Sequence, residues 1–266
     1  MPAPPTIRCF SDGDALASAA LAFIIHAAQD AIAARGRFTI ALTGGSSPVA
    51  TYALLARTPP GQIAWDKWEI FLGDDRFVPA GDDRSNYGQA RRLLLDNVPV
   101  PAKNIHPIDT GAASPAAAAT EYSETLRQVF GLTDGAAPPV FDLVLLGLGD
   151  DGHCASLFPH MPTLAVTDLW VVSTPPGTLP PPVDRVTLTY PVLNAPRQVL
   201  FLVSGANKAA PVFDILEGGA SREVHPGAGI RPVSGTLTWM LDAAAASLLT
   251  ESRGAQRVEH SGPSRQ

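Results

Sequence analysis

The residues best suited to chemistry lie in one glycine-rich segment, residues 147–153, which reads GLGDDGH. It follows an apolar run, Phe141–Leu146, that is typical of a strand buried on both faces of a parallel sheet. In open α/β sheets, ligands bind just beyond the carboxyl ends of such strands. His153 stands there as a candidate general acid or base, and Asp151 is close enough in sequence to orient its ring.

A second candidate site is the turn Thr43–Pro48, between an expected strand and an expected helix. Its glycines let the backbone approach a ligand, while its hydroxyls and the free N–H groups of the helix start can donate to oxygens. The residues concerned are Gly44, Gly45, Ser46 and Ser47. The turn predicts a cradle for one phosphate, with an ordinary serine-capped helix start as the alternative. It has neither the Gly-Lys-Ser/Thr of a Walker loop nor the last glycine of a nucleophile elbow.

Charged residues follow two further expected strands. Asp74 and Arg76 come after the strand expected at 68–72, and Lys208 comes after the one expected at 198–204. A guanidinium at a strand end can bind a carboxylate, a phosphate or a developing oxyanion, and an ammonium there suits a phosphate. The alternatives are a local ion pair for Arg76 and a solvent-exposed lysine.

Other candidate motifs are weaker. Residues 147–152 formally match G-x-G-x-x-G, but they put two carboxylates where a pyrophosphate would rest, so we reject a dinucleotide site. Cys154 adjoins His153, yet sequence neighbours rarely face each other, so a small core thiol is expected. His106, His160 and His225 show no metal-ligand spacing with Cys, Asp or Glu, and no metal is predicted.

The elements that must position these residues alternate between strand-like and helix-like patterns. Strands are expected at 38–42, 68–72, 105–108, 141–146, 169–173, 185–189 and 198–204. Helices are expected at 15–29, 49–56, 86–97, 116–130, 208–216 and 236–249. This alternation predicts one α/β domain over residues 1–250, with a mostly parallel open sheet flanked by helices in a Rossmann-like three-layer arrangement. Residues 251–266 lack apolar periodicity and are expected to be a disordered tail.

Composition narrows the range of partners. The 266 residues are 45% hydrophobic and 17% charged, with a net charge of −6, which argues against a nucleic-acid partner held by phosphate contacts. The uncharged run 15–29 follows Asp12 and Asp14 and is too short to span a bilayer, so it is expected to be an amphipathic first helix rather than a signal peptide or membrane anchor. Two cysteines far apart in sequence fit a reducing cytoplasm.

Taken together, these segments resemble the 6-phosphogluconolactonase family of the glucosamine/galactosamine-6-phosphate isomerase-like superfamily. The matching segments are LTGGSSP (42–48), GDDRFVP (73–79), SNYG (85–88), FDLVLLGLGDDGHCASLFP (141–159), RVTLTYPVLNAPR (185–197), SGANKA (204–209) and GTLTWMLDAAA (235–245). They run in the family's order and cover most of the chain between residues 38 and 249. The DGH-xx-SLFP segment with its preceding strand is the most specific of them.

The resemblance implies hydrolysis of 6-phospho-D-glucono-1,5-lactone to 6-phospho-D-gluconate in the oxidative branch of the pentose phosphate pathway, with no cofactor or metal. It implies a small phosphosugar lactone as the partner and a monomer or small homo-oligomer in the cytoplasm. At the catalytic centre it places His153 as general base, with Asp151, Arg76 and Asp74. At the substrate and its phosphate it places Gly44, Gly45, Ser46, Ser47, Lys208 and Arg185. Many relatives carry Glu where this chain has Asp75, whose role is left open.

Two other functions remain open. An amino-sugar-phosphate deaminase/isomerase of the same fold is similar at residues 151–153 but follows them with an Asn-Glu-Pro segment, in which the Glu assists ring opening. This chain has Ser156-Leu157-Phe158-Pro159 there, with no carboxylate. A non-catalytic phosphosugar-binding regulator would need the phosphate cradle but not His153, and would usually carry a DNA-binding module, of which the sequence gives no sign.

Overall fold

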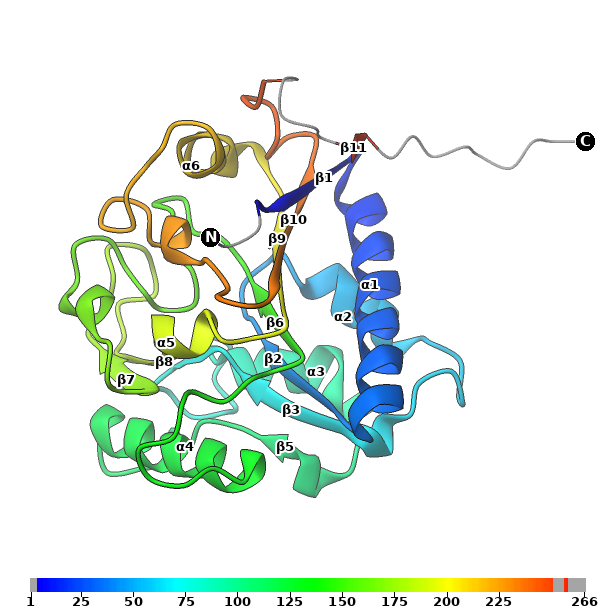
Figure 1. The fold of residues 1–266 in the computed structure, drawn as a ribbon, viewed down its shortest axis with the longest axis vertical. Helices are drawn as coiled ribbons and strands as arrows, with labels where there is room; N and C mark the ends of the chain where they lie inside the picture. Colours follow the sequence, from blue (N-terminus) through cyan, green and yellow to red (C-terminus); the bar gives the residue numbers. More distant parts are fainter. Residues whose placement is uncertain (1–3, 251–255, 258–266) are drawn as a thin grey trace, which may run out of the picture.

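A single twisted sheet forms the centre of the molecule in the computed structural model, which describes residues 4–250 and 256–257 (Figure 1). Among these residues, eight strands pair in parallel in the order β11-β1-β10-β9-β6-β2-β3-β5. Their bounds are β1 Thr6–Phe10, β2 Phe38–Leu42, β3 Trp68–Leu72, β5 Ile105–His106, β6 Leu143–Leu146, β9 Gln198–Val203, β10 Thr236–Asp242 and β11 Gln256–Arg257. The predicted α/β fold with a mostly parallel sheet is confirmed.

Helices cover both faces of this sheet. Helix α1 (Gly13–Arg35) and helix α2 (Val49–Ala56) lie on one face, with α3 (Asn86–Leu93) beside α2 (Figure 1). On the other face lie α4 (Pro115–Phe130), α5 (Tyr190–Leu193) and α6 (Ala209–Leu216). Because both faces are covered, every residue of β2 and β6 is buried, which explains why these strands read as continuous apolar runs.

A small antiparallel sheet beside the main one was not expected. Its strands are β4 (Asp74–Arg76), β8 (Arg185–Leu188) and β7 (Val171–Thr174), in the order β4-β8-β7. Two of its strands were expected near these positions, but sequence patterns do not reveal which sheet a strand joins. The small sheet pairs the segment after β3 with a segment more than a hundred residues later, and it thereby brings Arg76 opposite Arg185.

The predicted helix at 236–249 is wrong. Thr236–Asp242 is β10, which pairs in parallel with β1 and β9 in the middle of the sheet. A short apolar run buried on both faces gives no periodicity that separates strand from helix, and here Thr238 and Trp239 favour the strand. The N-terminal strand β1 was not expected either, because its run of five residues is brief and mixes polar with apolar side chains.

Helix α1 is longer than expected. The carboxylate of Asp12 accepts from the N–H of Ala15 at its start, and Gly36 ends it with a positive φ of 77°. At 23 residues it is long and apolar enough to cross a membrane by length and composition alone, which corrects the expectation that the run is too short. The same test is passed by core helices, and one face of α1, including Leu16 and Ile24, is buried in the hydrophobic core.

Of the predicted disordered tail, the structure describes only residues 256–257, which pair with β1 as β11. The rest of that prediction lies outside the described residues.

The order of strands indicates where a ligand would bind. From the centre of the sheet, β2, β3 and β5 follow one another toward one edge, whereas β6, β9 and β10 follow one another toward the opposite edge. The reversal falls between β2 and β6, and the crevice at such a reversal is where ligands bind in open α/β folds.

Candidate active site

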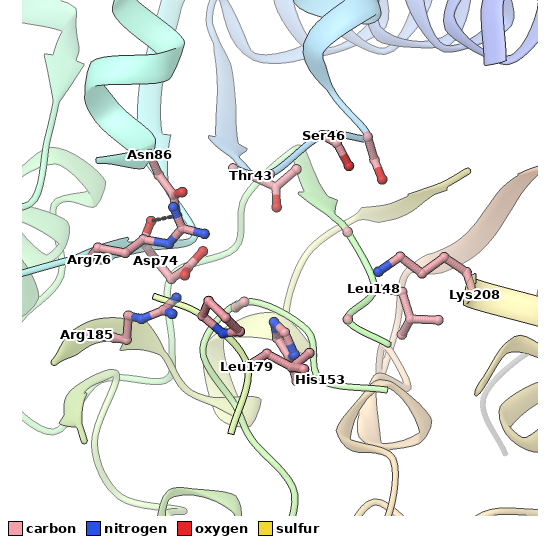
Figure 2. Close-up of a pocket in the computed structure, with 17 residues that line it drawn as sticks. Thr43, Ser46, Asp74, Arg76, Asn86, Leu148, His153, Leu179, Arg185 and Lys208 are labelled. Carbon is pink, nitrogen blue, oxygen red and sulfur yellow. Dashed lines mark hydrogen bonds between the residues drawn. The ribbon is translucent and has the colours of Figure 1, made fainter. Parts of the chain in front are cut away.

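One pocket lies at the carboxyl ends of the four adjacent strands β9, β6, β2 and β3 (Figure 2). The predicted site residues that line it are Gly44, Gly45, Ser46, Ser47, Asp74, Arg76, His153, Arg185 and Lys208. Asp151, the remaining one, lies directly behind His153 and is hydrogen-bonded to it. In Figure 2, Arg76, Arg185 and Asp74 lie on one side of the pocket, Lys208 on the opposite side, and His153 between them.

The histidine is held by its neighbouring carboxylate. Oδ1 of Asp151 is 2.6 Å from Nδ1 of His153 and also accepts from the His153 backbone N–H at 3.0 Å. Burial raises the pKa of Asp151, but the hydrogen bonds and charge of His153 outweigh it, so the pKa lies below its ordinary value. The carboxylate therefore stays ionised and holds the imidazole proton on Nδ1, which leaves Nε2 as the nitrogen available for reaction.

Glycines make this arrangement possible. A Cβ atom on Gly149 would lie 2.0 Å from Nδ1 of His153 and 2.6 Å from Oδ1 of Asp151, so only glycine fits beside the pair. Gly152 has a φ of +78°, a conformation that glycine adopts without strain. The N–H of Gly149 donates to the carbonyl of His153 at 2.8 Å, which closes the segment into a tight loop.

The turn Thr43–Pro48 after β2, called the serine–glycine turn below, is held in place by a tyrosine and an asparagine. The hydroxyl of Tyr52, on α2, donates to the carbonyl of Thr43 at 2.8 Å and accepts from its N–H at 3.0 Å. Gly44 lies against Asn86 so closely that a Cβ would come within 1.8 Å of Oδ1 of that side chain. Gly45 has a φ of +85°. The turn therefore presents its backbone and the Ser46 hydroxyl to the pocket.

Lys208 reaches the pocket from the end of β9. Its ammonium group is hydrogen-bonded to Oδ1 of Asp150, which also accepts from Nδ2 of Asn207 at 2.8 Å. Lys208, with Asn207, holds the pKa of Asp150 below its ordinary value. The Lys208 side chain is only 14% exposed, so the alternative of an ordinary solvent-exposed lysine does not hold.

The acidic residues after β3 have different environments. Asp74 lines the pocket and is buried, and its Oδ2 accepts from the hydroxyl of Ser156 at 2.6 Å. Asp75 points away from the pocket and accepts from the backbone N–H groups of Arg76, Asn86 and Tyr87. This buried carboxylate ties β4 to the start of α3. Its function in the structure is thus to hold the backbone of two pocket residues, Arg76 and Asn86.

Arg185 is buried, with its guanidinium over the ring of Phe158 at 5.4 Å. Burial lowers the pKa of Arg185, and the carboxylates of Asp74 and Asp75 partly oppose this effect. The guanidinium also donates to the carbonyls of Pro181 and Val183 at 3.1 and 3.3 Å, which fixes the loop before β8.

Four further lining residues, Thr43, Gly147, Leu148 and Gly149, belong to the two glycine-containing segments that the sequence singled out. The lining residues that lie outside those segments and were not predicted as site residues are Asn86, Ala155, Leu179 and Pro180. Asn86 had a signal in the segment SNYG (85–88), but no chemical pattern marked its side chain. Leu179 and Pro180 belong to a proline-rich loop whose position over the pocket no local pattern reveals.

Among residues 4–250 and 256–257, no group of three or more His, Cys, Asp or Glu side chains is arranged to hold a metal ion. The independence of the reaction from metals and cofactors stays a prediction. Cys154 is buried, and burial raises the pKa of its thiol, which disfavours the thiolate that a nucleophile would need.

The fold and pocket define an α/β protein that can hold a small anion beside a histidine–carboxylate pair. The chain belongs to the family of glucosamine-6-phosphate isomerases and 6-phosphogluconolactonases, whose model matches residues 11–239. A 6-phosphogluconolactonase of Nostoc sp. is 40% identical over 246 residues, which are 92% of this chain and 98% of that protein. The Homo sapiens 6-phosphogluconolactonase is 40% identical over 252 residues, 94% of this chain and 95% of the relative.

Solved structures agree with this assignment. The 6-phosphogluconolactonase from Trypanosoma brucei superposes with a TM-score of 0.80 and 33% identity, covering 92% of this chain and 99% of that one. A monomeric glucosamine-6-phosphate deaminase superposes with a TM-score of 0.75, but at 20% identity it shows only the shared fold.

Proposed function

We propose that this protein hydrolyses 6-phospho-D-glucono-1,5-lactone to 6-phospho-D-gluconate, with His153 as the general base. One observation supports the proposal above all others. The hydrogen-bonded Asp151–His153 pair borders the same pocket as the serine–glycine turn and Lys208. That combination offers acid–base chemistry and anion binding within reach of one small phosphorylated ligand.

The chemistry asked of His153 is modest, because a δ-lactone is a reactive ester. Asp151 holds the proton of the neutral imidazole on Nδ1, so the lone pair of Nε2 can take a proton from the attacking water. The water oxygen adds to C1 of the lactone and forms a tetrahedral intermediate. Asp151 then stabilises the imidazolium, which returns the proton to the ring oxygen as the C1–O5 bond breaks.

Negative charge develops on the C1 carbonyl oxygen during this addition. Arg76 is the proposed partner of that oxygen, since its guanidinium lines the pocket on the side where Asp74 and Arg185 also lie (Figure 2). Asp74 accepts from Ser156, an interaction that holds the carboxylate in place beside the two arginines.

The phosphate is proposed to bind at the serine–glycine turn and Lys208. Ser46 and the backbone of Gly44 and Gly45 supply hydrogen-bond donors near the start of α2, and Lys208 supplies a positive charge. Binding the phosphate away from C1 uses binding energy to orient the lactone against His153.

The deaminase/isomerase alternative is less well supported. The segment that would carry its ring-opening Glu is occupied by residues with structural contacts. Ser156 is fully buried, and its hydroxyl donates to Asp74. The ring of Phe158 packs against the His153 ring, with the ring centroids 4.8 Å apart. A lactone needs no acid to open a hemiacetal, so this arrangement suits lactone hydrolysis.

The deciding experiment is a hydrolysis assay on freshly generated 6-phosphogluconolactone, corrected for spontaneous ring opening. Glucosamine 6-phosphate is tested beside it under the same conditions. We expect saturable lactone hydrolysis and no ammonia release from the amino sugar. Activity on glucosamine 6-phosphate alone would favour the deaminase, and saturable binding of both sugars without turnover would favour a regulator.

We also propose that the protein works in the cytoplasm as a monomer or small homo-oligomer, without a nucleic-acid or membrane partner. The net charge of −6 and the burial of one face of α1 in the core are in keeping with this view. Gel filtration of the purified protein tests the oligomeric part of the proposal.

A further inference from the structure

His225 contacts the loop that carries the Asp151–His153 pair, but it does not line the pocket. It immediately precedes the short helix η6 (Pro226–Gly229), and its side chain is 15% exposed. Nδ1 of its ring is 3.0 Å from the backbone carbonyl oxygen of Asp151. Nε2 is 3.1 Å from Oδ2 of Asp214, on α6. The imidazole thus bridges helix α6 and the peptide between residues 151 and 152.

Both partners of the His225 ring are acceptors. A carbonyl oxygen and an ionised carboxylate can only accept, so the two hydrogen bonds form together when each ring nitrogen carries a proton. Asp214 faces one side of the ring, and the Asp151–His153 pair lies beyond the Asp151 carbonyl on the other. The hydrogen bond to Asp214 fixes the orientation of the ring and thereby the direction in which its Nδ1–H points.

The same segment holds the next peptide as well. The N–H of Gly227 donates to the carbonyl of Gly152 at 2.8 Å. The ring of His225 packs so close to Gly152 that a Cβ there would lie 2.3 Å from Nδ1. The backbone carbonyls of Asp151 and Gly152 are therefore both hydrogen-bonded to this segment, the first to the His225 imidazole and the second to η6.

We infer that His225 is a positioning residue for the catalytic pair: its hydrogen bond to the Asp151 carbonyl keeps the Asp151 carboxylate on Nδ1 of His153. The inference rests on the proposed function, because it concerns the same reaction. Asp214 orients His225 and anchors it to α6, the helix that begins directly after Lys208. The catalytic loop is thereby tied to the helix that directly follows the proposed phosphate anchor, Lys208.

Two amide substitutions distinguish between the two hydrogen bonds that the His225 ring makes. In H225N the side-chain Nδ2 can take the place of Nδ1 and donate to the Asp151 carbonyl, while the bond to Asp214 is lost. In H225Q the amide nitrogen falls near the position of Nε2, so the bond to Asp214 can persist while the bond to the carbonyl is lost. H225A removes both bonds, and D214N weakens only the orientation of the ring.

The control is His106, whose Nε2 is 2.7 Å from Glu69 and whose side chain is 13% exposed. It lies on β5, at the far edge of the sheet, so H106Q makes the same substitution as H225Q in a comparable histidine–carboxylate pair that is away from the loop. Circular dichroism and thermal melting confirm that each variant is folded, and kcat and KM are measured on the lactone. A merely structural loss would lower the melting temperature without following the order of kcat expected below.

We expect H225A and H225Q to lower kcat roughly 10- to 100-fold with KM within threefold of wild type, because a small displacement of a catalytic group has effects of this size. H225N should recover most of kcat, and H106Q should leave kcat within twofold. Equal kcat in wild type and H225A, or recovery by H225Q rather than H225N, would overturn the inference. If H225A does not fold, the H225N and H225Q pair decides alone. Absence of hydrolysis in wild type and H106Q alike would instead refute the proposed function.

Discussion

Arg76 and Arg185 stand directly opposite each other on the antiparallel strands β4 and β8, and both line the pocket. Two guanidinium groups on facing positions repel each other, and in the structure Asp74 lies beside them. An anion or a developing negative charge in the pocket relieves this repulsion. The pairing therefore supports the proposal that this side of the pocket binds the oxygen on which charge accumulates during lactone hydrolysis.

The first prediction concerns Arg76. Arg76→Gln should lower kcat by roughly 10²- to 10³-fold, the usual effect of removing one donor to a developing oxyanion, with a small change in KM. Steady-state kinetics on the lactone separate the two constants. The matched control is Arg84→Gln, since that arginine pairs with Asp82 on the surface and reaches Arg76 only through its backbone carbonyl. A large rise in KM with unchanged kcat would place Arg76 at the phosphate instead.

The second prediction concerns the catalytic pair. His153→Gln should lower kcat by roughly 10²- to 10⁴-fold, the typical contribution of a general base. Asp151→Asn should also lower kcat, because an amide no longer fixes the imidazole proton on Nδ1. Both variants should keep KM near the wild-type value, since neither residue is placed at the phosphate. Near-normal kcat in the His153 variant would remove that residue from the mechanism.

The third prediction separates binding from chemistry. Lys208→Ala should raise KM roughly 10- to 100-fold with little change in kcat, because a hydrogen bond to a charged group contributes about 1.5–3 kcal/mol. The control is Lys103→Ala, because Lys103 is exposed and far from Lys208 in the sequence. This variant should leave both kcat and KM unchanged. An unaltered KM in the Lys208 variant would mean that the phosphate binds elsewhere in the pocket.

Much of the main sheet could be predicted from the sequence. Strands such as β2 and β6 are largely apolar and are followed closely by glycines, so their existence and their carboxyl ends are visible in the sequence. The last strand, β10, could not be predicted in this way. It is buried on both faces between β1 and β9, and its identity depends on partners far away in the chain.

The candidate site was predictable wherever a strand end carried a chemical pattern. That rule found His153, Ser46, Arg76 and Lys208, because parallel strands deliver their carboxyl ends to one edge of the sheet. It could not find the contact between Asn86 and Gly44, which depends on how α3 packs beside the turn. It also gave no role to His225, whose two partners are 11 and 74 residues away in sequence.

Asp75 shows how a buried carboxylate can serve the pocket without entering it. It accepts from three backbone N–H groups and, at 3.2 Å, from the hydroxyl of Ser85. Burial raises its pKa to about 6, although the backbone hydrogen bonds act in the opposite direction and the nearby Asp74 adds to the rise. The charged form of Asp75 is therefore less favourable in the folded protein than in the unfolded chain.

This leads to a prediction about stability. Between pH 4 and pH 6 the folded protein holds a proton on Asp75 that the unfolded chain, with its ordinary pKa of 3.8, has begun to lose. The contribution of Asp75 to the free energy of unfolding is thus fully present below about pH 4 and is lost as pH rises through 6, with a total change of roughly 3 kcal/mol. Asp75→Asn cannot titrate, so its stability should lack this part of the pH dependence.

Urea unfolding of wild type and Asp75→Asn at several pH values from 4 to 7 measures the difference directly. The gap between the two free energies should shift in favour of the variant as pH rises. Asp83→Asn is a suitable control, because the Asp83 carboxylate is almost fully exposed. A gap that stays constant from pH 4 to 7 would show that Asp75 is ionised throughout, and that its hydrogen bonds from Arg76, Asn86 and Tyr87 outweigh the effect of burial.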